Sequence, residues 1–501
     1  MKRFLCKKHG RNSVELKFRY LIDKSSKRRR DYFHIKFYFF FPYAFNIGPS
    51  TYDRTDFFAD QKLYLRFNTP VFLTDELLQA KNSPLLRLES MLDRSSEDGG
   101  KGAPFNYSDF VYESKLLGSV YKSLHRELYY WLRKRLRRDE EKRILEEAPG
   151  IFEQANEIAR RCHQLTARVL ESGELFSPEV SNHLLMIDEY LSLVLERYYL
   201  WAFQLLGSKR LYRNFIAELE RRIKIEMEYR AERGYPTVTY PNISEARLEE
   251  YVYRSKILKR YVSEVLFFRV RKLDQGKGIE HLLYAVAAGV AMVLATSLAF
   301  FGQSAFGNLS ISLFVVLVVG YMLKDRVKEL FRDIFSKFIG KYFYDRRVKV
   351  SDPRRGRRLA VVKDKVYFSD SESIPEEILQ ARNRGSFERS LAKTANESIL
   401  VYEKMVRLHS GTLKHIHNRI RGLADISIIS VRQFLRYLSV QKREIPLFED
   451  GKIVELKSVQ RLYHMNVVVS YQGADISFRD KIRLVVDGKG IRRIEKTENS
   501  R

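Results

Sequence analysis

The chain is poor in cysteine and tryptophan, with two of each in 501 residues. Cys6 and Cys162 are far apart and belong to no CxxC pair, so the sequence predicts neither a disulfide framework nor a thiolate zinc site. This cysteine usage is typical of proteins in a reducing cytoplasm.

Acidic residues are outnumbered by basic ones. Lys and Arg total 90 against 62 Asp and Glu, which gives a formal net charge of +28. Such an excess favours a polyanionic neighbour, either an anionic membrane surface or a nucleic acid. With 45% hydrophobic and 30% charged residues, most of the chain has the composition of folded domains with real cores.

Motifs that identify common enzyme classes are missing. The sequence has no phosphate-binding loop of the GxxxxGK[ST] type and no HExxH, GxSxG, kinase or EF-hand motif. These absences favour a protein that is not an enzyme. We therefore assign no catalytic residue, no metal ligand and no cofactor from the sequence.

One weak carboxylate cluster remains near the N-terminus. Asp53, Asp56 and Asp60 have helical spacing, so on a helix they would share one face. Grouped carboxylates can hold a divalent cation or transfer protons. Ordinary surface positions and a helix cap explain these residues better than a site does.

A second weak cluster contains histidines. His409, His415 and His417 include a His-x-His pair, whose side chains would point the same way on a strand and could bind a metal ion. Because no cysteine or suitably spaced carboxylate lies nearby, a metal site here is the weaker interpretation.

The N-terminal part has a basic cluster at 27–30 followed by apolar residues, as a signal peptide does. The apolar stretch is aromatic, contains Lys36 and has no small-residue cleavage site, which argues against cleavage. The segments "VELKFRYLI" and "YFHIKFYFFF" are rich in β-branched and aromatic residues and predict two strands.

Residues 281–323 contain no Asp, Glu, Lys or Arg. As one helix this run would be about 64 Å long, twice the thickness of a bilayer core of about 30 Å. It predicts two membrane crossings, 282–301 and 309–323, joined by a turn at Gly302, Gly307 and Asn308. A helical hairpin in a soluble core is the alternative.

Basic residues flank this run on both sides, and the turn itself is uncharged. The positive-inside rule then places both termini in the cytoplasm of a multi-pass protein in the bacterial inner membrane. Small residues in the first crossing recur every four positions and indicate close helix packing, either against the second crossing or between protomers. They are Ala287, Ala291, Ala295 and Ala299.

Two basic segments follow the run. An amphipathic helix at 324–344 should either lie at the membrane surface or dock on the protein itself. Its basic face consists of Lys328, Arg332, Lys337 and Lys341. A turn at 352–358 is rich in arginine and is either a head-group contact or simply solvated. Its arginines are Arg354, Arg355, Arg357 and Arg358.

The rest of the chain divides by composition and periodicity. We expect a β-rich region at 1–93, a linker at 94–104, a helical region at 105–278, and an α+β domain at 345–501 with a helix at 424–438. Strands near both ends of the chain are candidates to pair with each other. The fold class predicted is an α+β membrane protein, with cytoplasmic helical and β regions flanking a two-helix transmembrane hairpin.

The terminal strands, and "GYMLKDRVKEL" where the hairpin closes, make the chain similar to uncharacterised bacterial two-span inner-membrane proteins. The resemblance implies a bacterial membrane location and no particular activity.

Three functions remain open. The first is a membrane-anchored scaffold or regulatory protein that contacts anionic lipid and binds a protein partner, either as a single chain or as a homo-oligomer. The second is a membrane-tethered nucleic-acid-binding protein. The third is a membrane enzyme that acts on a lipid or nucleotide, for which Asp53 and Asp56 would be the candidates.

Overall fold

The structure, a computed structural model, divides the chain into two compact units. The sheet unit comprises Met1–Arg66 and Phe268–Arg501, and the helical unit comprises Phe67–Phe267. The structure describes residues 4–21, 30–97, 105–172, 176–207, 209–238, 244–274, 276–307, 310–353, 356–383, 397–414, 422–450, 452–473 and 476–497, without the side chains of 95–97, 274, 276–280, 336–342 and 497.

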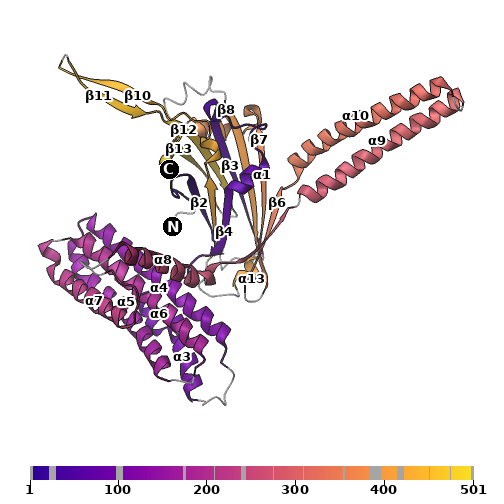
Figure 1. Cartoon of the computed structure of the whole chain (residues 1–501). Coiled ribbons are helices and arrows are strands. Elements are labelled where there is room, and N and C mark those ends of the chain that lie inside the picture. Colours follow the sequence, from indigo (N-terminus) through magenta and orange to yellow (C-terminus); the bar gives the residue numbers. More distant parts are fainter. Residues whose placement is uncertain are drawn as a thin grey trace. The chain divides into compact units, whose positions relative to one another are not determined.

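The sheet unit is built on an antiparallel sheet of eight strands in the order β14-β13-β12-β3-β8-β7-β6-β5 (Figure 1). The strands are β3 (Asp31–Pro42), β5 (Arg269–Asp274), β6 (Arg346–Ser351), β7 (Arg358–Ser369), β8 (Glu397–Leu408), β12 (Tyr463–Gln472), β13 (Ser477–Asp487) and β14 (Gly490–Thr497). Strand β3 pairs with β12 on one side and β8 on the other, so segments from both ends of the chain meet in one sheet.

A smaller sheet packs on one face of the large one. Its order is β1-β2-β9-β4, made by β1 (Phe4–Lys8), β2 (Ser13–Leu21), β9 (Gly422–Ser430) and β4 (Gln61–Phe67). Aromatic contacts join the two sheets, with ring centroids 5.6 Å apart for Phe18 and Phe37 and 5.0 Å apart for Tyr20 and Phe33. The face of the large sheet away from this contact is called the outer face below.

The helix predicted at 424–438 is wrong. Residues up to Ser430 form β9, which pairs with β2 from Ser13 to Leu21, and only a short 3₁₀ turn follows. The isoleucines of "GLADISIIS" favour a strand, and pairing with β2 outweighs the apparent helical spacing.

A buried polar link crosses the interface between the sheets. Lys404 Nζ of β8 lies 2.8 Å from Asp425 Oδ2 of β9, and the Tyr20 hydroxyl donates to the same oxygen at 2.8 Å. Burial alone would lower the pKa of Lys404, but the Asp425 carboxylate outweighs it and the pKa is raised. The ammonium is therefore held charged in the core, where it depends on its partner.

Asp425→Ala should destabilise the sheet unit by about 3–5 kcal/mol, because it leaves the Lys404 charge buried and uncompensated. The double variant Lys404→Met/Asp425→Leu, which removes both charges, should recover most of this loss. Denaturant unfolding of the three proteins measures the difference. Equal destabilisation of the single and double variants would contradict the role assigned to the ion pair.

The helical unit consists of α2 (Thr74–Gln79), α3 (Pro84–Glu97), α4 (Tyr107–Leu136), α5 (Glu141–Glu171), α6 (Pro178–Leu206), α7 (Arg213–Glu232) and α8 (Glu245–Ser263). Helix α6 is central and packs against α4, α5, α7 and α8. It carries buried charges with partners: Glu196 lies beside Arg230, and Asp188 accepts from Tyr229. These buried and paired charges lie in the core of the helical unit.

Helices α9 (Gly276–Phe306) and α10 (Ile311–Tyr342) form an antiparallel pair between β5 and β6 in the chain (Figure 1). The predicted fold class, with its two-helix transmembrane hairpin, is wrong. Among the described residues only one helix, His281–Phe306, is long and apolar enough to cross a membrane. The expected second crossing, 309–323, supplies only the start of α10, which continues into charged residues from Lys324.

The length of that second segment explains the correction. Fifteen helical residues rise about 22 Å, which is shorter than a bilayer core of about 30 Å. The predicted location, a multi-pass protein of the bacterial inner membrane with both termini in the cytoplasm, depended on two full crossings and is wrong for the same reason.

Candidate membrane-binding hairpin

The two helices of the hairpin pack through small residues. A Cβ atom built on Gly302 would lie 2.8 Å from Val316 Cγ1, so α10 can approach α9 here only because residue 302 is glycine. A Cβ on Gly320 would lie 3.8 Å from Leu298 Cβ. These contacts pair 302 with 316 and 298 with 320, and the pairing fixes which parts of α9 and α10 lie at the same level.

The predicted alanine ridge lies on this packed side of α9. Ala287 and Ala291 are fully buried, and Ala295 and Ala299 are partly buried. The carbonyl oxygen of Ala295 is 4.0 Å from the position of a Cβ on Gly320. The four alanines therefore belong to the contact within the hairpin, not to a free surface for a second protomer.

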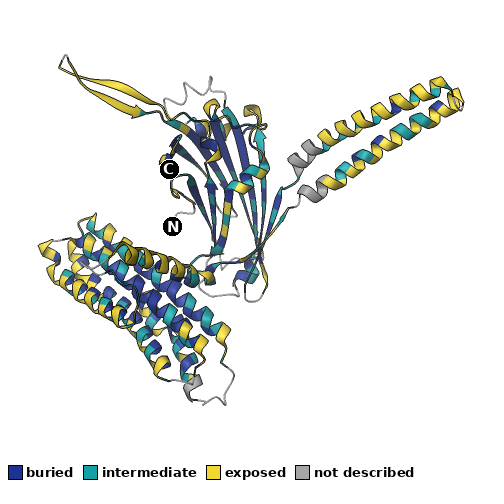
Figure 2. Cartoon of the chain, in the orientation of Figure 1, coloured by how far each residue is buried: buried dark blue, intermediate teal, exposed yellow. Residues whose placement is uncertain are grey.

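The outer end of the hairpin is apolar on both helices. We define this tip as 294–306 of α9 and 311–323 of α10, each about 20 Å long. Its side chains are largely exposed (Figure 2). The exposed large apolar residues are Leu294, Phe300, Phe301, Phe306, Ile311, Phe314, Val315, Leu317, Val318, Val319, Tyr321, Met322 and Leu323.

Charge begins abruptly below the tip. Lys324, Asp325 and Arg326 follow Leu323 directly on α10, and the predicted surface residues Lys328 and Arg332 are exposed one and two turns further on. The pairing places these charges beside the part of α9 before residue 294. A membrane that accommodated all of α9 would therefore also have to bury this charged part of α10.

Aromatic and basic groups meet in the charged half. The Arg332 guanidinium lies 4.6 Å from the ring centre of Tyr284 on α9. Tyrosine and arginine are typical of the interface between lipid and water. The other two predicted contacts, Lys337 and Lys341, have side chains outside the described part of the structure.

Two polar groups beside the hairpin turn are hydrogen-bonded within their own helices. The Gly307 amide donates to the Gln303 carbonyl at 3.1 Å, which continues the last turn of α9. Ser310 Oγ accepts from the Leu313 amide at 3.1 Å and caps α10. Satisfied backbone groups reduce the cost of moving this end of the hairpin out of water.

The arginine-rich turn lies between β6 and β7. Arg357 and Arg358 are exposed there, while Arg354 and Arg355 fall outside the described residues. The structure thus leaves at least two cations of this turn open to solvent.

The aspartate cluster has a structural role. Asp53 Oδ1 accepts from the Asp56 amide at 2.8 Å and Asp56 Oδ2 accepts from the Asp53 amide at 3.1 Å, a capping box that starts α1 (Arg54–Asp60). Asp60 accepts from the Tyr52 hydroxyl at 3.1 Å. All three carboxylates thus have partners within the fold.

The described residues contain no group of three or more His, Cys, Asp or Glu side chains that could hold a metal ion. Of the histidine cluster, His415 and His417 lie outside the described residues. The backbone amide of His409 donates to the Leu359 carbonyl at 2.8 Å.

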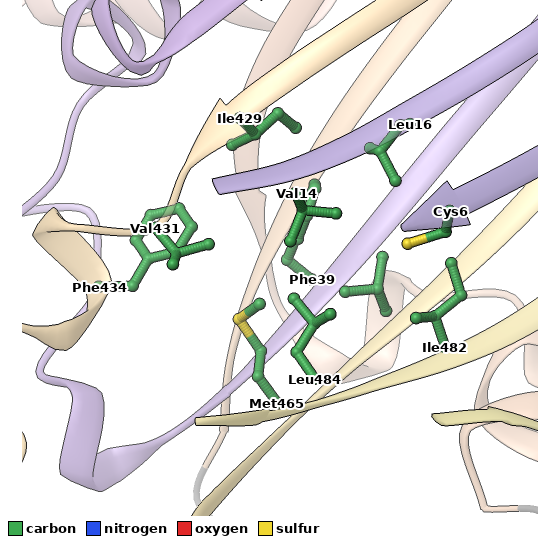
Figure 3. A pocket seen from close by; sticks show the side chains of 11 residues that line it. Cys6, Val14, Leu16, Phe39, Ile429, Val431, Phe434, Met465, Ile482 and Leu484 are labelled. Carbon is green, nitrogen blue, oxygen red and sulfur yellow. The ribbon is translucent and has the colours of Figure 1, made fainter. Parts of the chain in front are cut away.

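A small apolar cavity lies in the sheet unit, between side chains of both sheets (Figure 3). Its volume is about 10 Å³, and its lining includes Cys6, Phe39 and Met465. Burial raises the pKa of the Cys6 thiol to about 12, so this cysteine is unreactive at neutral pH. A cavity of this size and polarity is a packing defect and not a ligand site.

A larger polar hollow of about 220 Å³ opens on the outer face beside α11 (Glu376–Arg382). Its charges are already paired: His34 Nε2 lies 2.6 Å from Glu403 Oε1, Lys36 Nζ lies 3.5 Å from Glu403 Oε2, and Arg479 bonds Glu377. Burial would raise the pKa of Glu403, but its bonds to His34 and Lys36 lower it. These charged residues around the hollow thus form an ion-pair network with one another.

No protein-family model, curated protein or solved structure matches the chain.

Proposed function

We propose that the protein is a membrane-anchored scaffold, held at a bilayer by the apolar tip of the α9–α10 hairpin. The supporting observation is the cluster of exposed apolar side chains on both helices of the tip, which on α10 ends where Lys324 begins the charged half. Exposed apolar clusters of this kind mark membrane or protein contacts.

The distribution of residue types favours lipid over a protein partner for the tip. Apolar residues surround the helix pair on its exposed sides, whereas a protein partner usually needs one apolar face. Moving one phenylalanine of the tip from water to hydrocarbon contributes about 1.5–3 kcal/mol. A few such residues suffice for stable attachment.

The charged half of α10 limits how far the hairpin enters. Lys324, Arg326 and Lys328 would lie at the level of anionic head groups when the tip is in hydrocarbon. This anchor requires neither a second full crossing nor burial of the charged half of α10.

A scaffold also needs a surface for protein partners, and the β10–β11 ribbon supplies one. Strands β10 (Lys442–Glu449) and β11 (Lys452–Gln460) pair only with each other among the described strands. An isolated two-stranded ribbon is marginally stable in water. Its exposed apolar residues are Ile445, Leu447, Phe448, Ile453, Val454, Leu456 and Val459.

We assign this ribbon to a contact with a second copy of the chain. Both of its strands have open edges, and an open apolar edge pairs readily with an identical one around a twofold axis. Such pairing would place two anchors in one assembly and strengthen membrane attachment.

The anchor is tested by vesicle flotation. Full-length protein should float with phosphatidylcholine vesicles containing anionic lipid, and the tip variant Phe300→Lys/Phe314→Lys should not, because two charges would enter hydrocarbon. Tyr130→Lys/Tyr253→Lys, at two exposed aromatic residues of the helical unit, adds the same two charges outside the tip and is the matched control, which should float. Flotation of the tip variant at the wild-type level would disprove the anchor.

The ribbon contact is tested by sedimentation velocity in detergent. Wild-type protein should sediment as a dimer, and Phe448→Ser/Leu456→Ser should shift it to monomer by removing apolar area from the contact. Tyr437→Ser, at another exposed aromatic residue, should leave the dimer intact. A monomeric wild type, or a dimer that persists in the ribbon variant, would contradict the assignment.

A further inference from the structure

The outer face of the large sheet is basic over strands β5 to β8. We call this surface the basic face and define it by Arg271, Arg347, Lys349, Lys363 and Arg407. Strand register places Arg271 opposite Lys349, Lys349 opposite Val361, and Val361 opposite Arg407. A neighbouring row sets Arg347 opposite Lys363. Neither row contains a carboxylate.

These cations repel one another in the absence of an anion. Neighbouring strands are about 4.8 Å apart, so directly opposed cations such as Arg271 and Lys349 have backbones only that far apart. The carboxylate of Glu403 on β8 is already bonded to His34 and Lys36. Nothing else described on the outer side of these two rows neutralises the face.

Two guanidinium groups in the face carry a second indication of a ligand. The Nε atoms of Arg347 and Arg407 are buried and have no hydrogen-bond partner among the described residues. A buried donor without a partner costs free energy that an anion at this position would recover. The two side chains come from β6 and β8, on either side of β7.

Further cations surround this pair. His409 directly follows the last residue of β8, and its pKa is lowered by burial first, then by Arg407, and further by Arg30 and Arg358. Arg358 belongs to the arginine-rich turn, so the turn and the basic face form one positive surface. The sequence indicated the arginine-rich turn. It gave no sign that basic residues of β5, β6 and β8 extend the same positive surface.

A membrane is a poor partner for this face when the tip is inserted. About 18 residues of α9, 276–293, separate the apolar tip from β5, a distance of about 27 Å along the helix. Unless the hairpin lies flat, which would withdraw its tip from hydrocarbon, the face is too far from the head groups to touch them.

We infer that the basic face binds the phosphate backbone of a single-stranded nucleic acid. The guanidinium forks of the face match phosphate oxygens, and neighbouring strands present the cations in two rows along which a single strand can lie. Tyr32 of β3, opposite Arg407 in the register and 52% exposed, provides a ring on which a base can stack. This inference is independent of the proposed scaffold role.

The test uses full-length protein in detergent and a fluorescent oligouridylate, followed by anisotropy over a range of salt concentrations. Arg347→Gln/Arg407→Gln should weaken binding and reduce the slope of log K against log salt by about 1.4, or about 0.7 for each phosphate contact removed. Tyr32→Ala should weaken binding roughly tenfold with an unchanged slope, because it removes stacking and no charge.

Lys134→Gln/Lys142→Gln in the helical unit removes the same charge at two exposed positions and should leave affinity and slope unchanged. If Arg347→Gln/Arg407→Gln does not fold, Arg271→Gln/Lys349→Gln replaces it and should show the same decrease in slope. Three results would overturn the inference: equal effects of the helical-unit and face variants, absence of salt-sensitive binding, or displacement of the probe by polyglutamate as effectively as by unlabelled oligouridylate. Vesicle flotation of the face variants should be unchanged, which separates this result from a failure of the anchor.

Discussion

The placement of β3 between β12 and β8 is the constraint on which the sheet unit depends. Each partner comes from the C-terminal part of the chain, so the large sheet is complete only when distant segments meet. The aromatic side of β3 packs on the smaller sheet, and the Lys404–Asp425 pair fixes the two sheets to each other. The same alternation puts His34 and Lys36 on the outer face. One strand thus defines both the core and the outer surface.

The hairpin leaves this framework at a defined point. Strand β5 leads into α9 and α10 leads back into β6, and the two strands pair from Arg269 to Asp274. The root of the hairpin is therefore held by backbone hydrogen bonds, while the described helices of its tip pack against each other. This division suits an anchor, because the tip can partition into lipid without disturbing the folded sheet. It also places the basic face at the root of the same hairpin.

Much of the fold was accessible from local sequence patterns. Strands β2 and β3 and the capping role of Asp53 follow from periodicity and end signals. The helix predicted at 424–438 failed because pairing of β9 with β2 is a long-range contact that no local window contains. The prediction of a second crossing failed because it rested on the absence of charge along 281–323. The position of Lys324 beside α9 depends instead on how the two helices pair.

The candidate surfaces were predictable to different degrees. The apolar tip and the cations at Lys328 and Arg332 are evident from composition. The basic face is not, since Arg271, Lys349 and Arg407 come from segments far apart in the chain and become neighbours only through strand register. The partial burial of the arginines is likewise invisible in a sequence.

The depth of the hairpin in lipid is the most direct measure of the central claim. A fluorophore attached to a cysteine introduced at Ser304 should be quenched by quenchers on lipid acyl chains, whereas one at Glu329 should respond to quenchers at the head groups. Burial raises the pKa of both native cysteines, Cys6 and Cys162, and keeps them unlabelled. A label at Ser304 quenched only from the aqueous phase in the presence of vesicles would show that the tip does not enter the membrane.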